Sequence, residues 1–180
     1  MSRIGRNPVK LPAGVTVTFT EGELKVKGPK GELSQRVDDN KIQVNIEDGQ
    51  AVVSRLSEAK TVRAKHGLYR ALLANMVTGV TTGFTKVLVV NGVGYKVQKQ
   101  GNKVVFNVGY SHPVEFEIPS DVAVEVTAPT EVTVSGISKD SVGQAAANIK
   151  DIRRPDPYHA YGIRYKDEVI ARKEGKTAGK

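Results

Sequence analysis

The chain runs twice through the same order of several short strands followed by one helix, and this repetition constrains the fold more than any other feature. Segments with alternating apolar residues lead into a helix over residues 57–79, and the same plan begins again at Phe84 and reaches a helix near Ser141. The segments VSRLS at 53–57 and VSGIS at 134–138 also correspond. A chance match between β-rich segments is the alternative, but the shared order of elements argues against it. We predict an α+β fold of two tandem similar domains, each a mainly antiparallel sheet with one packed helix.

The boundary between the repeats is expected near residues 80–84. The predicted organisation is an N-terminal repeat with a basic arm over residues 1–82, a C-terminal repeat over residues 83–165 and a basic tail over residues 166–180. The tail is polar and cannot bury enough apolar surface to fold alone, so we expect it to be disordered until it is bound.

Alternating apolar residues predict strands in both repeats. These strands cover residues 15–19, 24–27, 33–37, 42–46, 51–53, 87–90, 95–97, 104–108, 114–118, 122–126 and 132–134. We expect Ser57 to cap the first helix and Gly79 and Gly83 to end it. For the second helix, Ser141 and Gln144 match a capping box.

Each predicted helix has one apolar face that would pack on its sheet. In the first helix this face consists of Val62, His66, Tyr69, Leu73 and Met76. In the second helix it consists of Val142, Ala145, Ala146, Ile149 and Ile152.

The net charge of +8 is concentrated at the two ends of the chain. Residues 1–14 contain three basic residues and no acid, and residues 150–180 contain nine basic residues against five acids. Residues 104–138 contain five acids and no Lys or Arg. This asymmetry indicates a polyanionic partner at one end and an acidic face turned away from it. Basic tails that only aid solubility are the alternative.

The stretch KDIRRPDPYHAYGIRY at residues 150–165 combines arginines, prolines and aromatic rings. Pro155 and Pro157 should end the preceding helix near Ile152, and we expect a stiff, extended segment to follow. Guanidinium groups match phosphate oxygens, and planar rings can lie on sugars or unstacked bases, so the pattern favours folded RNA over a small ligand. A proline-rich loop with a solvated charge cluster is the alternative explanation.

The predicted RNA-binding residues are therefore cations and aromatic residues of this stretch and of the tail. They are Arg153, Arg154, Tyr158, His159, Tyr161, Arg164, Lys166, Arg172, Lys173, Lys176 and Lys180. Tyr95 and Lys96 are expected to add an accessory contact. They follow Gly92 and Gly94, which would form a bulge, permit the close approach of a backbone or serve plain turn chemistry.

Catalytic and cofactor motifs are absent from the sequence. The chain has no Cys, its three histidines show no metal-ligand spacing, and no Ser lies in a G-x-S-x-G motif. The G-x-G at residues 92–94 runs on into a predicted strand instead of a helix, and the Gly-Lys-Thr at residues 175–177 lacks the first glycine of a phosphate loop. We expect no enzyme activity, cofactor, metal or small-molecule substrate.

Nothing in the sequence indicates a membrane or secreted protein. The first residues lack the apolar run of a signal peptide, and no segment approaches the roughly 20 apolar residues of a membrane span. We expect a cytoplasmic location and no membrane partner.

Four motifs together carry a resemblance that covers essentially the whole chain. They are SRIGRNP at residues 2–8, GPKGEL at residues 28–33, GVGYK at residues 92–96 and PDPY through GIRY at residues 155–165. The chain resembles the bacterial-type family of the sixth protein of the large ribosomal subunit. The resemblance implies two similar α+β domains, binding to large-subunit ribosomal RNA chiefly through the second, and no catalysis. It also implies a position near the sarcin–ricin loop and the stalk base, beside neighbouring ribosomal proteins and the docking site of translation factors.

One departure from the family pattern concerns charge. Where the family commonly has Lys-Gly-Lys after the Pro-Tyr pair, this chain has His159, Ala160 and Tyr161, so two fixed positive charges are missing. Arg153, Arg154, Arg164 and the tail lysines would then carry more of the attraction to phosphate. A protein–protein interaction module that recruits an acidic partner is the main rival function. DNA binding is weaker, because neither helix has a basic, groove-facing row of residues.

Overall fold

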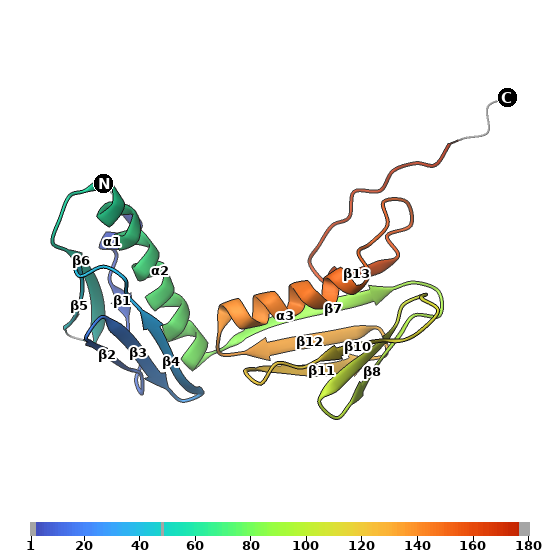
Figure 1. Ribbon diagram of the computed structural model, residues 1–180, viewed down its shortest axis with the longest axis horizontal. Helices are drawn as coiled ribbons and strands as arrows, with labels where there is room; N and C mark the ends of the chain where they lie inside the picture. The colour runs from blue at the N-terminus through green and yellow to red at the C-terminus, as the bar shows by residue number, and fades with distance from the viewer. Residues whose placement is uncertain (1–2, 48, 177–180) are drawn as a thin grey trace. The chain divides into compact units, whose positions relative to one another are not determined.

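The computed structural model describes residues 3–47 and 49–176, and it confirms the α+β class (Figure 1). The chain divides into two compact units. The N-terminal unit runs to Phe84 and includes Ile137–Lys139, and the C-terminal unit consists of Thr85–Gly136 and the chain from Asp140 onward.

The N-terminal unit consists of two antiparallel three-stranded sheets and one long helix. One sheet is the meander of β2 (Thr16–Thr20), β3 (Glu23–Gly28) and β4 (Gly31–Arg36). The other has the order β1 (Val9–Lys10), β6 (Gln50–Arg55) and β5 (Ile42–Glu47). The helix α2 (Lys60–Thr81) packs against strands of both sheets, and the short helix α1 (Arg3–Arg6) packs on α2 and β6.

The C-terminal unit repeats this plan with one additional strand. Its meander consists of β8 (Lys96–Gln100), β9 (Lys103–Asn107) and β10 (Val114–Glu117). Its second sheet has the order β11 (Val122–Ala128), β12 (Glu131–Gly136), β7 (Phe84–Asn91) and β13 (Gly162–Tyr165). The helix of this unit is α3 (Lys139–Ile152). In chain order β7, β11 and β12 correspond to β1, β5 and β6, whereas β13 has no counterpart in the described part of the N-terminal unit.

The predicted helix faces are buried. All five residues of the first face are less than 10% exposed, including the polar His66 at 3%. In α3 the first four residues of the predicted stripe are buried, while Ile152 at the end of the helix is partly exposed. A strand also lies at each predicted position, and the structure adds β1 and β13, which the alternation pattern did not indicate.

Both predicted helix starts were wrong. The N-cap residue of α2 is Ala59, and Ser57 Oγ instead accepts a hydrogen bond from the Ala59 N–H at 3.3 Å. Ser141 lies inside α3, which begins two residues earlier, so it cannot be the cap, since a cap residue lies before the first helical residue. Gly83 ends α2 as expected: its φ is +78° and its N–H returns to the Thr78 carbonyl at 3.0 Å.

Gly79 lies within α2 and does not end it. A Cβ atom at this position would collide with the carbonyl oxygen of Ile137, so the glycine allows a close approach of backbone. No helix in the described residues is long and apolar enough to cross a membrane.

Candidate nucleic-acid interface

The candidate interface begins at the end of α3, which stops at Ile152 as predicted. Tyr110, in the loop after β9, donates a hydrogen bond from its hydroxyl to the Ile152 carbonyl at 2.9 Å. The Arg153 guanidinium lies over the ring of Tyr110, 4.9 Å from its centroid. Tyr110 therefore satisfies a terminal helix carbonyl and positions Arg153, two roles that the sequence pattern did not reveal.

The segment after α3 forms a tight loop, so the prediction of an extended segment was wrong for residues 156–160. The carboxylate atom Oδ1 of Asp156 accepts hydrogen bonds from the N–H groups of Tyr158, His159 and Ala160 at 3.0, 2.6 and 2.7 Å. Ala160 has a φ of +59°, which is the left-handed conformation. The two prolines upstream predict an extended backbone instead. A short acidic side chain that closes the turn on itself outweighs the extended preference of the two prolines.

Asp156 is held in its charged form by this loop. Partial burial acts to raise its pKa, but the three N–H donors and the nearby His159 outweigh it, so the pKa lies below its ordinary value. The charged carboxylate is the acceptor that fixes the loop.

The loop presents aromatic rings on its surface. Tyr158 is 52% exposed and Tyr161 is 38% exposed. The rings of His159 and Tyr161 stack with their centroids 5.3 Å apart and an angle of 23° between their planes. Planar groups fixed in this way can stack on bases or sugars with little further loss of side-chain freedom.

The strand β13 anchors the end of the loop. It pairs with β7 in an antiparallel register that places Ile163 opposite Val90, and Ile163 is fully buried. The Ile163 N–H donates a hydrogen bond to the Arg153 carbonyl at 2.7 Å, and the Asn91 side chain donates one to the Ala160 carbonyl at 3.2 Å. The helix end, the loop and the sheet edge are thereby joined in one structure.

Gly162 makes this closure possible. A Cβ atom there would lie 2.7 Å from the Arg154 carbonyl oxygen and from Pro155, and the φ of the residue is +146°. No other residue type fits both the backbone conformation and the space.

Arg164 is turned toward the protein backbone. Its Nη1 atom donates to the carbonyls of Tyr165, Lys166 and Glu168 at 3.3, 3.3 and 3.1 Å, and the residue is only partly exposed. In this arrangement Arg164 holds the turn that follows β13.

Glu168 links the same turn to α3. One carboxylate oxygen accepts from Lys150 Nζ at 2.6 Å, and the other accepts from the Tyr165 N–H at 3.1 Å. The hydrogen bond from Lys150 is the main reason that the pKa of Glu168 lies below its ordinary value. The start of the tail is therefore attached to the helix.

The other predicted cations lie at the surface. The Arg154 side chain is 75% exposed and pairs with Asp151 at 2.8 Å, and the Lys166 side chain is 60% exposed and pairs with Glu131 at 3.0 Å. Exposed pairs of this kind exchange readily for a phosphate partner.

The tail up to Lys176 contains no helix or strand, and Arg172, Lys173 and Lys176 are exposed. The Lys173 N–H bonds the Pro157 carbonyl at 2.8 Å, which brings the tail alongside the loop. Lys180 lies outside the described residues.

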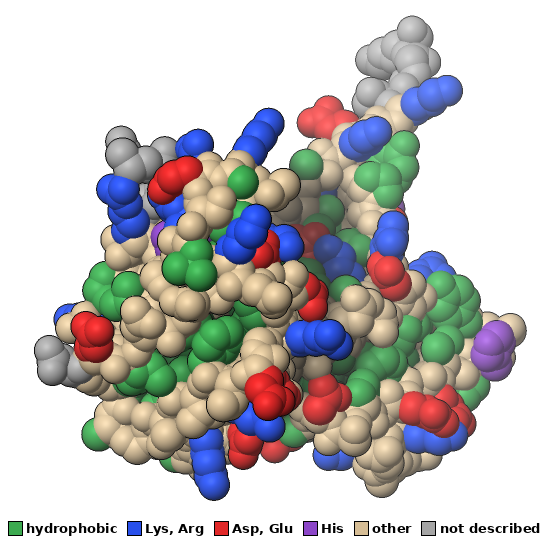
Figure 2. Space-filling model, turned by 60° about the vertical axis from the view of Figure 1, so that its left-hand side comes forward, with side chains coloured by type: hydrophobic (Ala, Val, Ile, Leu, Met, Phe, Trp, Pro, Cys, Tyr) green, Lys and Arg blue, Asp and Glu red, His purple; other side chains and the backbone are tan. Residues whose placement is uncertain are grey.

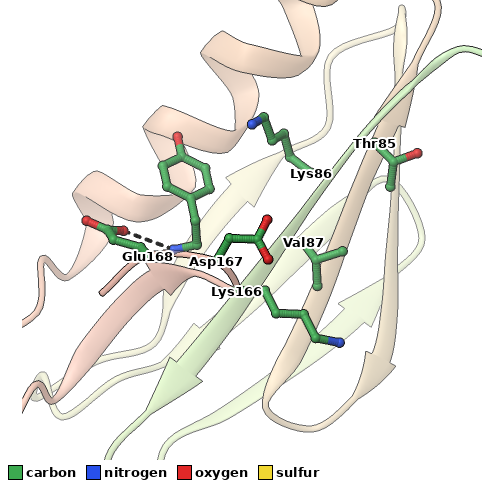
Figure 3. Close-up of a pocket in the computed structure, with 7 residues that line it drawn as sticks. Thr85, Lys86, Val87, Lys166, Asp167 and Glu168 are labelled. Atoms are coloured by element: carbon green, nitrogen blue, oxygen red, sulfur yellow. Dashed lines mark hydrogen bonds between the residues drawn. The ribbon is translucent and has the colours of Figure 1, made fainter. Parts of the chain in front are cut away.

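Two further lysines, which the sequence analysis did not single out, lie beside this site. Lys86 Nζ and Lys150 Nζ are 5.6 and 5.1 Å from the centroid of the Tyr165 ring. Figure 3 shows Lys86 and Lys166 on opposite sides of a hollow of about 360 Å³, which is also lined by Tyr165, Asp167 and Glu168. A neighbouring hollow of about 440 Å³ includes Lys150 and Arg154 in its lining. The pairing of β13 with β7 and the bond from Lys150 to Glu168 bring these distant residues together.

The predicted accessory site is organised by close packing. A Cβ at Gly92 would lie 2.5 Å from the Tyr95 ring and one at Gly109 would lie 3.0 Å from it, so the ring rests on two glycine backbones. Of the options for Gly92, the structure therefore shows the close approach, alongside a turn in which the Tyr95 N–H bonds the Gly92 carbonyl at 3.3 Å. Lys96 is exposed on β8. Tyr95 is partly buried, and only Lys96 is fully presented to a partner.

The described residues contain no group of three or more His, Asp or Glu side chains that could hold a metal ion.

Comparison with known proteins identifies the family. The sequence model of the family described as Ribosomal protein L6 matches residues 11–83 and 91–166, one segment in each repeat. A protein of Clostridium perfringens is 55% identical over 98% of this chain and 99% of its own length. A protein of Exiguobacterium sibiricum is 52% identical over 98% of this chain and 99% of its own length. A protein of Chlorobium phaeobacteroides is 48% identical over the full length of both chains. All three relatives are named large ribosomal subunit protein uL6. The chain belongs to the ribosomal protein L6 family.

Proposed function

We propose that this protein binds large-subunit ribosomal RNA near the sarcin–ricin loop and the stalk base, and that it supports the region where translation factors dock. As a member of the L6 family it is a structural constituent of the large ribosomal subunit in the cytoplasm, not an enzyme. The observation that carries the finer proposal is the closed loop at residues 153–162, which combines exposed rings and cations on a backbone that is already fixed.

The residues of the proposed interface, in the loop and in the tail, have two roles. Arg154, Lys166 and the tail cations are exposed and supply phosphate contacts, which carry affinity without sequence information. Tyr158, His159 and Tyr161 supply planar surfaces for unpaired or splayed nucleotides. The two fixed charges that are missing at positions 159 and 161 are replaced here by a stacked pair of rings.

A second group of residues positions the first. Arg153 is fixed by Tyr110, and Arg164 is turned to three backbone carbonyls. The outer edge of the Arg153 guanidinium can still contact a phosphate, whereas Arg164 holds the turn that follows β13. Tyr95 supports the adjacent loops, and Lys96 remains an accessory phosphate contact.

The two hollows beside Tyr165 add Lys86 and Lys150 to the proposed interface. Lys86 and Lys166 line one hollow, and Lys150 and Arg154 line the neighbouring one. Two of these cations are partly neutralised by carboxylates, Lys150 by Glu168 and Lys166 by Glu131. We therefore assign Lys86 the stronger phosphate contact.

The test is binding of the full chain to large-subunit ribosomal RNA over a series of salt concentrations. The double variant Arg153→Gln with Arg154→Gln should lower the log–log salt slope by roughly 1.4 to 1.8, because each lost phosphate contact removes about 0.7 to 0.9. The control is Arg36→Gln with Lys99→Gln, which removes the same charge from exposed strand positions. Equal slopes for the two double variants would refute the assignment of these arginines.

The position on the RNA needs a separate readout. Backbone cleavage of the bound RNA by hydroxyl radicals should show protection next to the sarcin–ricin loop and the stalk base. Protection confined to other helices would contradict the proposed location while leaving RNA binding intact.

A further inference from the structure

The pair Asn91-Gly92 ends strand β7, and it is the one place in the sequence where an asparagine precedes a glycine. The chain contains eight asparagines, and the other seven precede residues with side chains. Because a glycine has no side chain, nothing obstructs an attack by its own backbone nitrogen on the preceding side chain. An Asn-Gly pair is therefore the sequence in which an asparagine most readily loses its amide group.

The loss of the amide group needs only water as a co-reactant. The backbone nitrogen of Gly92 attacks Cγ of Asn91 and gives up its proton, while the bond between Cγ and Nδ2 breaks and ammonia leaves. The product is a cyclic imide, a succinimide. Water then adds to one of the two ring carbonyls and breaks the bond from that carbonyl to the Gly92 nitrogen. The result is aspartate or isoaspartate, in which the backbone runs through the former side chain.

The nitrogen that would attack is not engaged by the fold. Within the described residues the Gly92 N–H donates no hydrogen bond, whereas the N–H groups of Val90 and Tyr95 donate to the Thr130 and Gly92 carbonyls at 2.8 and 3.3 Å. Asn91 and Gly92 are both partly exposed, so water has access to the pair. The sheet hydrogen bond that would hold this N–H in place is therefore missing.

The glycine of the pair is required by its surroundings. A Cβ atom at Gly92 would lie 2.5 Å from the ring of Tyr95, and the φ of Gly92 is +159°. A larger residue, which would slow the reaction, is thereby excluded at this position. The reactivity of the pair then depends on what holds Asn91.

Two contacts restrain Asn91. Its backbone pairs with Gly162 of β13, and its Nδ2 atom donates to the Ala160 carbonyl at 3.2 Å. In the extended backbone of a strand, Cγ and the next nitrogen are directed apart, so closure of the ring requires rotation of the Asn91 backbone. The strand β13 has four residues and lies at the edge of its sheet, where local opening costs less than in the centre. Opening of this edge frees both contacts together.

We propose that Asn91 is a site of spontaneous deamidation and that the reaction releases the loop at residues 153–162. The amide group that donates to the Ala160 carbonyl becomes a carboxylate, which only accepts hydrogen bonds, so two acceptors then face each other. Isoaspartate also adds a methylene group to the backbone and displaces the turn that follows Asn91. The loop that Asp156 closes thereby loses its side-chain link to β7.

The new carboxylate also changes the charge of the C-terminal unit. This unit contains thirteen Lys and Arg residues and eleven Asp and Glu residues, a net charge of +2, which deamidation lowers to +1. On the face drawn in Figure 2, Asp and Glu side chains lie among the Lys and Arg side chains. A smaller positive charge weakens the attraction to a polyanion. Weaker RNA binding by the deamidated chain rests on the proposed function, whereas the reaction itself takes place without RNA.

The test follows the amide group of Asn91 in the full chain at mildly alkaline pH and physiological temperature. Trypsin releases residues 87–96 as one peptide, and mass spectrometry with electron-transfer fragmentation distinguishes asparagine, aspartate and isoaspartate in it. A synthetic peptide of the same residues gives the unrestrained rate, and a sample taken at the start corrects for reaction during digestion. Aspartate and isoaspartate should accumulate at Asn91 in the folded chain, more slowly than in the synthetic peptide.

Asn40 is the control within the same chain. It is exposed, but it precedes Lys41, whose N–H donates to the Asp39 carboxylate at 3.0 Å. Asn40 should therefore keep its amide group over the period in which Asn91 reacts.

Three variants test the link between Asn91 and the loop. Asn91→Asp reproduces one product and should speed hydrogen exchange at the amides of residues 158–160 between about two- and tenfold, the range that corresponds to one lost hydrogen bond. Asp156→Ala loosens the loop and should speed deamidation at Asn91 by a similar factor. Glu125→Ala, at an exposed position of β11, should deamidate like the wild type.

A folded chain that keeps the amide group of Asn91 after the synthetic peptide has fully reacted would refute the proposal. Equal rates at Asn91 and Asn40 would refute the role of the unbonded Gly92 N–H. Unchanged rates in Asp156→Ala, or unchanged hydrogen exchange in Asn91→Asp, would overturn the release of the loop. None of these measurements uses RNA, so their failure leaves the proposed function standing, and a failure of the unmodified chain to bind RNA leaves the deamidation site standing.

Discussion

The carboxylate of Asp156 accepts a hydrogen bond from the backbone N–H of Ala160 at 2.7 Å and holds that residue at a φ of +59°. The same oxygen serves the two preceding N–H groups. One short side chain thus determines the shape of the loop that carries the exposed rings.

Removal of this acceptor should loosen the loop. Asp156→Ala is expected to speed hydrogen exchange at the amides of Tyr158, His159 and Ala160 and to weaken RNA binding several-fold, because these amides lose their shared partner. Asp156→Asn keeps a carbonyl oxygen and should show a smaller effect. Glu125→Ala, at an exposed acid of β11, is the control. Unchanged exchange in Asp156→Ala would show that the loop does not depend on this carboxylate.

Replacement of glycine by alanine should have opposite effects at two positions of the C-terminal unit. Gly162→Ala is expected to lower the free energy of unfolding by about 1–3 kcal/mol or more, since the φ of +146° is strained for alanine and the methyl group meets the backbone of Arg154 and Pro155. Gly143→Ala places a methyl group in open space inside α3 and should raise it by about 0.5–1 kcal/mol. Urea unfolding measures both. A loss of stability at Gly143 would contradict the packing described for α3.

Acid should weaken the attachment of the tail to α3. Glu168 has a folded-state pKa below its ordinary value of 4.5, mainly because of the hydrogen bond from Lys150. A carboxyl group of this kind contributes stability that is fully present above its unfolded pKa and is lost as the pH falls through the folded value. The free energy of unfolding should therefore fall between about pH 5 and pH 3, and Glu168→Gln should show a smaller fall.

The control for this pH series is Glu174→Gln, an exposed acid of the tail. Its acid profile should follow that of the wild type. Identical profiles for all three proteins would exclude Glu168 as a contributor to acid sensitivity.

Removal of the tail should lower the affinity for RNA without changing the fold. A chain that ends at Ile170 keeps β13 and loses four basic residues, so it should fold normally and bind RNA with a salt slope lower by up to about 3. A chain that ends at Asp151 also loses the fully buried Ile163, and its C-terminal unit should be strongly destabilised. Circular dichroism and RNA binding would be measured together. An unchanged slope for the chain that ends at Ile170 would assign no phosphate contact to the tail.

Much of the fold could be predicted from the sequence because its periodicities are strong. The spacing of Val62, His66, Tyr69, Leu73 and Met76 marks a buried helix face whatever lies opposite it. The end of α3 follows from the two prolines beyond Ile152. The helix starts could not be predicted in this way, because Ser57 and Ser141 are each suitable cap residues and only the backbone geometry decides between them and their neighbours.

The candidate site was predicted as a stretch of sequence but not as a shape. The residue types of the loop indicate cations and rings, but the roles of Tyr110 and Lys86 depend on which distant segments meet. Arg164 was also not predictable in this way. Its sequence position suggests an exposed cation, whereas its guanidinium faces backbone carbonyls. The placement of Lys86 beside Tyr165 depends on the pairing of β13 with β7, a contact between residues more than seventy positions apart.

The position of β13 also governs the order of events during synthesis. The strands and helix of the N-terminal unit are all made before β7, so that unit can begin to fold early. The second sheet of the C-terminal unit gains its last strand only when Gly162–Tyr165 emerges, after nine-tenths of the chain has been translated. The loop that precedes this strand is anchored by it, so a chain interrupted before β13 lacks the anchor of the proposed RNA-binding loop. Completion of the second sheet is therefore tied to the last tenth of translation.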